Sequence, residues 1–221
     1  KTSGKQIQYD YNWNLRNLDI QPGDEISYYF EIFDNDGVNG SKSARTNVMQ
    51  WRMPTLDEYR KDQAQTAEEI QKDLEKAVRE SAKIQEELKK LRNKVLQQKE
   101  LDWQSRKEME KLLDRQKQLQ NQIEQAKQNF EESQKLQQEF DQQKNEELLE
   151  KQEQLQKMFE ESLSEEMKQL MEEIEKLLQE LNKDQMLEQM EQMQMSSEEL
   201  EKNLERLQEL YKQLEVENML Q

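Results

Sequence analysis

Residues 74–95, LEKAVRESAKIQEELKKLRNKV, carry a stripe of mostly apolar side chains at alternating spacings of three and four. The stripe consists of Leu74, Ala77, Ser81, Ile84, Leu88, Leu91 and Val95. This spacing places the stripe on one face of an α-helix, with Glu and Lys on both sides of it. The stretch therefore predicts a long amphipathic helix that pairs with another helix.

The helical pattern extends over the rest of the chain. Neither Gly nor Pro occurs after Pro54, whereas average usage would supply about twenty. Thr55 and Glu58 form a capping box, in which each side chain can bond the backbone amide of the other residue. Residues 54–164 are therefore predicted to form a long coiled-coil helix or helical arm, and the fold class is mainly α.

The apolar stripe continues with changes of phase, near Trp103 and again at Leu136 and Phe140. Its middle section is Leu112, Gln116, Leu119, Ile123, Ala126 and Phe130. Its third section is Leu155, Phe159, Leu163, Met167, Leu170, Ile174, Leu177 and Leu181, and its last is Leu200, Leu204, Leu207, Tyr211 and Leu214. A disordered tract has no reason to keep such a stripe, so helices are favoured over disorder.

Three polar sites predict interruptions near the end of the chain. Asn182 or Asp184 can cap a new helix, Ser196–Glu199 offers a second capping box, and Ser162 with Ser164 marks a further break. Residues 165–221 are therefore predicted to form a helical hairpin or small helical unit. A short helix, Met186 to Met195, would lie inside it, and a continuous rod is the main competing interpretation.

Candidate partner-binding residues lie on these stripes. They are Leu88, Leu91, Val95, Met186, Met190 and Met193, while Ile84 is left unassigned. Methionine faces adapt to varied apolar partners, but the cluster that also includes Met195 is more readily explained as core filler in a bundle. The pattern leaves open whether the helices pair within one chain or between chains.

Composition and charge exclude several functions. The chain is 32% apolar and 37% charged, with mean hydropathy −1.32 and net charge −16. Residues 1–53 contribute −1 and the remainder −15, a field that repels nucleic acid and anionic membranes. The chain has no His and no Cys, so imidazole and thiolate chemistry is excluded, and no phosphate-binding glycine loop can lie in the helical part. We therefore predict a non-enzyme without a cofactor.

The first fifty residues instead predict β-strands. Apolar residues alternate from Tyr9 to Leu15, from Ile26 to Ile32 and, more weakly, from Val48 to Met53, with a Pro22-Gly23 turn between the first two runs. The pattern resembles the last three strands of an immunoglobulin-like or fibronectin-type sandwich, although Ile26 stands where the fibronectin pattern has a tyrosine. Residues 1–53 are thus expected to be a partial sandwich.

One loop in this region is the candidate metal site. Asp34, Asn35 and Asp36 precede Gly37, and carboxylate and amide oxygens suit Ca²⁺. The twelfth position of the loop is Arg45 rather than the glutamate of an EF-hand. Because Asp and Asn also favour turns by bonding their own backbone, a plain hairpin loop is the preferred interpretation.

The succession of the two halves resembles a known family. The stretch YYFEIFDNDGVNGSKSARTNVMQWRMP, followed by a Gln/Glu/Lys-rich tract that closes with MSSEELEKNLERLQELYKQLEVE, looks like a domain-of-unknown-function envelope family of Bacteroidetes-type bacteria. Its members combine N-terminal membrane helices, immunoglobulin-like repeats and extended helical regions. The resemblance implies a periplasmic location, with an inner-membrane anchor in a longer protein.

Three functional hypotheses follow. The first is a structural or scaffolding component of an envelope assembly, whose helical arm pairs with other helices or with itself. The second is a holdase-like chaperone, which requires exposed apolar surface. The third is a Ca²⁺-dependent binding module, which requires metal-dependent stability.

Overall fold

The computed structural model describes residues 10–15, 18–34, 40–140, 146–180 and 182–219. The chain divides into two compact units, residues 1–62 and residues 63–221. The first contains the β-strands, and the second, called the bundle below, contains most of the helical residues.

The strands of the first unit form one long interrupted hairpin. Strand β1 (Glu25–Tyr28) pairs antiparallel with β4 (Met49–Arg52), and β2 (Glu31–Phe33) pairs antiparallel with β3 (Ser43–Arg45). The two ladders are joined at Phe30, whose N–H donates to Thr46 Oγ1 (3.0 Å) while the Thr46 N–H donates to the Phe30 carbonyl (2.9 Å). Between the two ladders, residues 29–30 oppose residues 46–48, so the second side of the hairpin carries one extra residue. This is a β-bulge.

The second and third predicted strand regions are therefore present. The second is split into β1 and β2 at this bulge, the third is β4, and β3 lies outside the predicted runs. The first predicted strand is not: the described residues 10–15 form no strand, and Tyr9 lies outside the described residues. Instead of joining a ladder, Trp13 packs edge-on against Tyr28, with ring centroids 5.9 Å apart. The described residues form a hairpin, and two facing sheets are not present among them.

Helix α1 (Leu56–Gln97) begins at the predicted capping box. The Glu58 N–H donates to Thr55 Oγ1 (3.3 Å), and the Thr55 N–H donates to Glu58 Oε2 (3.0 Å). Two of the amides that lack partners inside the helix are thereby satisfied. The predicted start of the helical region is confirmed.

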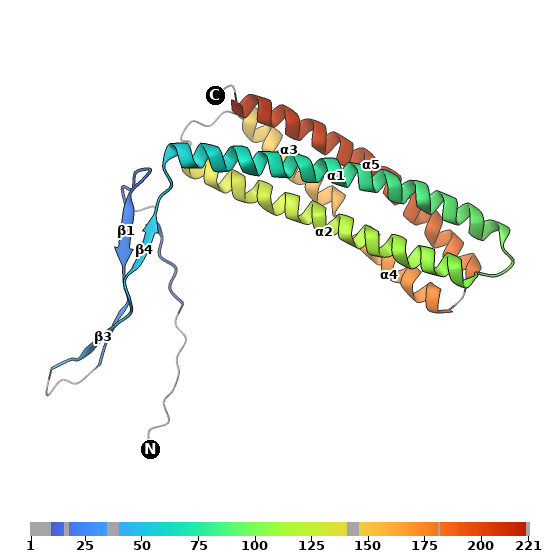
Figure 1. The fold of residues 1–221 in the computed structure, drawn as a ribbon, viewed down its shortest axis with the longest axis horizontal. Helices are drawn as coiled ribbons and strands as arrows, with labels where there is room; N and C mark the ends of the chain where they lie inside the picture. Colours follow the sequence, from blue (N-terminus) through green and yellow to red (C-terminus); the bar gives the residue numbers. More distant parts are fainter. Residues whose placement is uncertain (1–9, 16–17, 35–39, 141–145, 181, 220–221) are drawn as a thin grey trace, which may run out of the picture. The chain divides into compact units, whose positions relative to one another are not determined.

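The bundle is built from antiparallel rods. After α1 come α2 (Trp103–Phe140), α3 (Glu146–Ser162), α4 (Glu165–Glu180) and α5 (Lys183–Met219). Helix α2 runs back along α1, α3 and α4 follow one another along a third rod, and α5 returns beside them (Figure 1). The described helices thus form a four-rod, up-down-up-down bundle with one rod broken.

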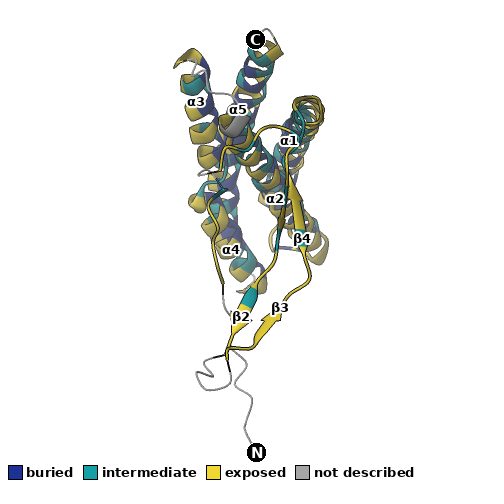
Figure 2. Cartoon of the chain, turned by 90° about the vertical axis from the view of Figure 1, so that its left-hand side faces the viewer, coloured by how far each residue is buried: buried dark blue, intermediate teal, exposed yellow. Residues whose placement is uncertain are grey.

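The core of the bundle coincides with most of the predicted stripe. All seven residues of the first section, all six of the section from Leu112 to Phe130, and all five from Leu200 to Leu214 are buried. Figure 2 shows these buried sides of the helices in dark blue. The mainly helical fold is confirmed, and the stripe pairs helices of the same chain.

The structure corrects the extent of the predicted arm. Residues 54–164 do not form one helix, because the chain turns between Gln97 and Trp103 and α1 and α2 lie antiparallel. The division expected at residue 164 has no counterpart either, since all of 63–221 is one compact unit. Folding back lets each stripe cover another, whereas an extended arm would leave its stripe in water.

Two of the three predicted helix breaks are present and one is not. Helix α4 does begin after Ser164, and α5 begins after Asn182, whose Oδ1 accepts from the Gln185 N–H (3.2 Å). The predicted break at Ser196–Glu199 is wrong, because α5 is continuous and no separate Met186–Met195 helix exists. The core spacing of three and four continues through Ser197 without a gap, so the helix has no reason to end there.

In the third section the phase of the prediction is partly wrong. Leu163, Leu170 and Leu177 are only half-buried, and the core positions are Met167, Met171, Ile174 and Leu178. Leu136 is 43% exposed rather than part of the seam. The side chain of Phe140 and residue Leu181 lie outside the described part of the chain.

Candidate functional site

The apolar face of the hairpin is the first candidate surface. Side chains alternate between the two faces of a strand, and cross-strand partners share a face. Ile26 is opposite Trp51 and Tyr28 is opposite Met49. The face so defined consists of Ile26, Tyr28, Phe30, Ile32, Met49 and Trp51.

Much of this face is uncovered within the described part of the first unit. Ile32 is 71% exposed, Phe30 47% and Trp51 38%, and β2 and β3 are largely yellow in Figure 2. Trp13 covers part of Tyr28, and Ile26 and Met49 are half-buried. Large apolar side chains grouped on one side of a hairpin are typical of a surface that packs against further structure.

The opposite face of the hairpin is mixed: it carries charged residues that pair with one another, and also Tyr29 and Phe33, which are 45% and 66% exposed. Arg45 pairs with Glu31 (Nε–Oε1 2.9 Å) and lies over the Tyr29 ring, 4.9 Å from its centroid. The hydrogen bond from Arg45 lowers the pKa of Glu31. Along β1 and β4 this face is polar, so in that part of the hairpin the apolar contact surface is the side of Ile26 and Trp51.

Ion pairing also fixes the junction from β4 to α1. Arg52 Nη2 lies 2.8 Å from Glu58 Oε1, the same carboxylate that bonds Thr55. The Arg52 hydrogen bond, followed by that of the Thr55 N–H, lowers the pKa of Glu58 to about 2. The carboxylate is therefore charged at any physiological pH, where it serves both the cap and the strand.

The candidate metal loop is described in part. Asp34 Oδ1 accepts from the Lys42 N–H (2.8 Å) and the Asp34 N–H donates to the Lys42 carbonyl (2.9 Å), so Asp34 helps to close the hairpin. Asn35 and Asp36 lie outside the described residues. Among the residues that are described, no group of His, Cys, Asp and Glu is arranged to hold a metal ion.

The candidate partner-binding residues lie in the bundle core. Leu88, Leu91, Val95, Met186, Met190 and Met193 are all buried under helices of the same chain. Met195, by contrast, is 68% exposed. Three of the four clustered methionines therefore serve as core filler, and the structure does not bring the six residues together on an open surface.

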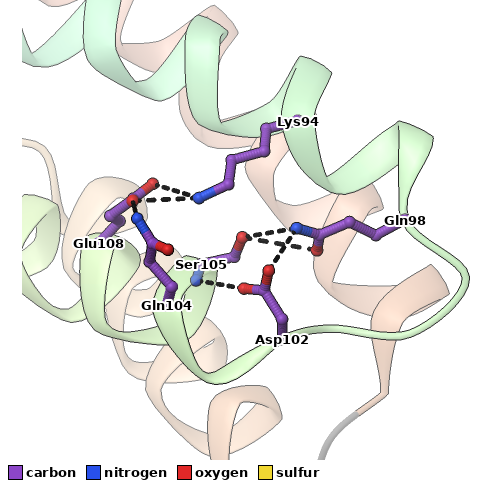
Figure 3. A network of polar contacts seen from close by, with 6 residues as sticks. All are labelled: Lys94, Gln98, Asp102, Gln104, Ser105 and Glu108. Atoms are coloured by element: carbon purple, nitrogen blue, oxygen red, sulfur yellow. Dashed lines mark hydrogen bonds and ion pairs between the residues drawn. The ribbon is translucent and has the colours of Figure 1, made fainter.

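The turn between α1 and α2 is held by a polar network that sequence analysis did not anticipate (Figure 3). Asp102 caps α2 by accepting from the Ser105 N–H (2.6 Å), and the same bond lowers the pKa of Asp102. The Gln98 amide donates to Asp102 Oδ2 (2.8 Å) and to Ser105 Oγ (3.1 Å). Across the hairpin, Lys94 pairs with Glu108 (3.1 Å). The sequence signal was Asp102 three residues before Ser105, an N-cap spacing.

A second network crosses three helices at the other end of the bundle. The side-chain amide of Gln152 on α3 donates to Gln137 Oε1 on α2 (3.0 Å), and the Gln137 amide donates to Asn218 Oδ1 on α5 (3.3 Å). The Asn218 amide in turn donates to Glu215 Oε1 (3.4 Å). Burial raises the pKa of Glu215, and burial together with the Glu215 charge raises that of Tyr211. These hydrogen bonds link α2, α3 and α5 to one another.

Charge is divided unevenly between the two halves of the bundle. Helices α1 and α2 carry 17 basic and 17 acidic residues, whereas α3, α4 and α5 carry 8 basic and 22 acidic. Cations of the first half meet carboxylates of the second, as Arg92 does with Glu191 (2.6 Å) and Lys117 with Glu175. Individual ion pairs of this kind, rather than opposite net charges, link the two halves of the bundle.

Comparison with models of known protein families gives no match for this chain, and comparison with curated proteins gives none either. None of the described helices is both long and apolar enough to cross a membrane.

Proposed function

We propose that this chain is a non-catalytic structural component of a bacterial envelope assembly. In this proposal the bundle is a preformed rigid body, and the apolar face of the hairpin joins it to further β-strands, as in an immunoglobulin-like sandwich. The hairpin, rather than the helical seam, is the point of attachment.

The observation that carries the proposal is the contrast in burial between the two units. The stripes of the bundle cover one another, with residues such as Ile84 and Leu204 fully buried, so the helices do not need a partner to hide them. The hairpin leaves Phe30, Ile32 and Trp51 in contact with solvent. At about 25 cal/mol per Å², covering this face would contribute favourably to an association.

The strand register supports a sheet as the covering element. A two-stranded hairpin is marginal by itself and gains stability from further strands or a packed layer. Alternation of apolar and polar residues on β1 and β4 is typical of a sheet with one buried side. The envelope location and the periplasmic setting rest on the family resemblance, through the FDNDGVNGSKS stretch at residues 33–43.

Site-specific photo-crosslinking in the native protein, in its own cells, tests this proposal. A photoreactive residue at Ile32 is expected to crosslink to β-strands of the same polypeptide or of one partner at constant stoichiometry. The matched control is Gln50, which is exposed on the polar face of the same hairpin and should crosslink little.

Two outcomes would overturn it. If both positions crosslink equally, the apolar face is not a specific contact. If Ile32 instead captures a heterogeneous set of unrelated unfolded proteins, the holdase-like chaperone is the better description.

A further inference from the structure

Seven polar side chains are buried among the described residues of the bundle, and three of them, one each on α1, α2 and α5, are almost fully buried and have an atom without a hydrogen-bond partner. Among the eight buried residues of α1, Ser81 is polar, and on α5 Ser197 stands between Met193 and Leu200. On α2 the stripe residue Gln116 is polar. The three side chains are 1–2% exposed, as deeply buried as the leucines around them.

These residues lie at one level of the bundle. Phe130 packs against Tyr211 and Gln137 bonds Asn218, so each α2 residue is level with the α5 residue 81 positions later. This offset places Gln116 level with Ser197. Arg115 bonds both Glu80 and Glu87 of α1, which places Ser81 within about one turn of Gln116. Ile174, which is fully buried on α4, completes the layer.

The layer costs stability. Ser81 Oγ, Gln116 Nε2 and Ser197 Oγ have no hydrogen-bond partner in the protein, and each buried unpaired group costs about 1–3 kcal/mol. At one level, two hydroxyls and an amide donor are the nearest polar groups to one another across the three helices, and a water that enters the core there would find several partners. Moved to different levels, each group would stand alone among apolar side chains.

We propose that Ser81, Gln116 and Ser197 form a register-setting layer, which holds α1, α2 and α5 in a single alignment. The apolar stripe repeats every seven residues, so leucines alone distinguish poorly between alignments that differ by one heptad. A one-heptad shift of α2 would bring Gln116 level with Met190 or Leu204. It would also bring Ser197 level with Met109 or Ile123, all four of them apolar and buried. The polar layer therefore penalises the shifted alignments, as single polar core residues do in coiled coils.

The absence of Cys from the sequence makes alignment directly measurable. Spin labels at Asn121→Cys on α2 and Gln169→Cys on α4, both exposed positions, report the distance between the two helices. With the natural core, one narrow distance population is expected. In the triple variant Ser81→Ala, Gln116→Leu, Ser197→Ala, we expect a higher melting temperature together with additional populations, because a heptad shift moves a label by about 10 Å along the helix.

The matched control is Gln120→Leu. Gln120 is also buried on α2 with an unpartnered Nε2, but its level on α5 is occupied by Glu201 rather than by a serine. This variant should keep one distance population. The proposal is overturned if the triple variant keeps a single population, if it loses helical content, or if Gln120→Leu broadens the distances equally. The single variant Gln116→Leu, which changes the core least, must show the same direction of change.

Discussion

The hairpin and the bundle solve the problem of apolar surface in opposite ways. In the bundle a narrow stripe on each helix is covered by stripes from the same chain, and residues from Ile70 to Leu214 share one core. In the hairpin most of the large apolar residues share one face, yet Ile32 and Phe30 remain exposed. The helices bury their apolar stripes against one another, while the strands leave much of their apolar face exposed.

This difference follows from geometry. A helix of about 40 residues needs only a turn to bring a second stripe against the first, as at residues 98–102 between α1 and α2. A hairpin has no such option, because its face is covered only by a layer from elsewhere in the structure. A polar chain can therefore hold a stable bundle and still carry an exposed apolar face on its hairpin.

The largest expected effect comes from truncating the two kinds of apolar residue in parallel. Leu204→Ala, at a fully buried core position, should lower the free energy of unfolding of the bundle by about 2–5 kcal/mol. Ile32→Ala should change it by less than about 0.5 kcal/mol, since Ile32 is exposed. Urea unfolding followed by far-ultraviolet circular dichroism measures both. Equal losses would show that the hairpin is part of the bundle's cooperative unit.

A second pair of variants compares a true helix cap with a false one. Asn182 caps α5, so Asn182→Ala should lower the stability of the bundle by about 0.5–2 kcal/mol. Ser196 lies within continuous α5. Because Ala has a higher helix propensity than Ser, Ser196→Ala should raise the free energy of unfolding by about 0.3 kcal/mol. Thermal unfolding of both variants under one buffer gives the comparison. A loss of stability in Ser196→Ala would indicate that the serine caps a helix after all.

The sites at Asn182 and Ser196 also show which helix ends the sequence could predict and which it could not. Both carry capping residues, but the core spacing is kept across Ser197 and lost between Leu178 and Met186. The phase of the stripe, not the capping residue, decides where a helix ends. The same rule explains the break after Ser162, where the next core residue, Met167, comes five positions later.

The stripe itself was predictable because burial in a bundle follows helical periodicity from Leu74 to Leu214. The closure of the bundle was not, since the same stripe suits pairing within or between chains and the turn at Asp102 lacks glycine and proline. On the hairpin, period-two alternation predicted the apolar face. The candidate loop of Asp34, Asn35 and Asp36 was suggested by residue types alone, which serve a turn as readily as an ion.

A third experiment concerns the one carboxylate of the α2–α5 network with a raised pKa. Burial raises the pKa of Glu215 above its usual 4.5, so its charged form is penalised in the folded state. The penalty is complete above the folded pKa and disappears as pH falls through that value toward 4.5. Glu215→Gln, which keeps an acceptor for Asn218, should therefore raise the melting temperature at pH 7 and should gain progressively less as the pH falls.

Glu209→Gln is the control for this experiment, because Glu209 is exposed on the same helix. Its difference from the natural protein should not follow the same pH dependence. A Glu215→Gln variant that is less stable at pH 7 would mean that the bonds from Asn218 and Tyr211 to the carboxylate outweigh the cost of burying its charge.

The smallest effect is expected from the ion pairs that join α1 to α2. Arg115 bonds Glu80 (2.6 Å) and Glu87 (2.5 Å) and is partly shielded from solvent, whereas Arg79 reaches Glu75 at 3.7 Å and is largely exposed. Arg115→Gln should cost up to about 1 kcal/mol at low salt, and Arg79→Gln close to zero. Because salt screens such pairs, the Arg115→Gln cost should shrink at 1 M NaCl, where the screening length is about 3 Å. A cost that is unchanged by salt would assign the role of Arg115 to the packing of its aliphatic stem between the helices.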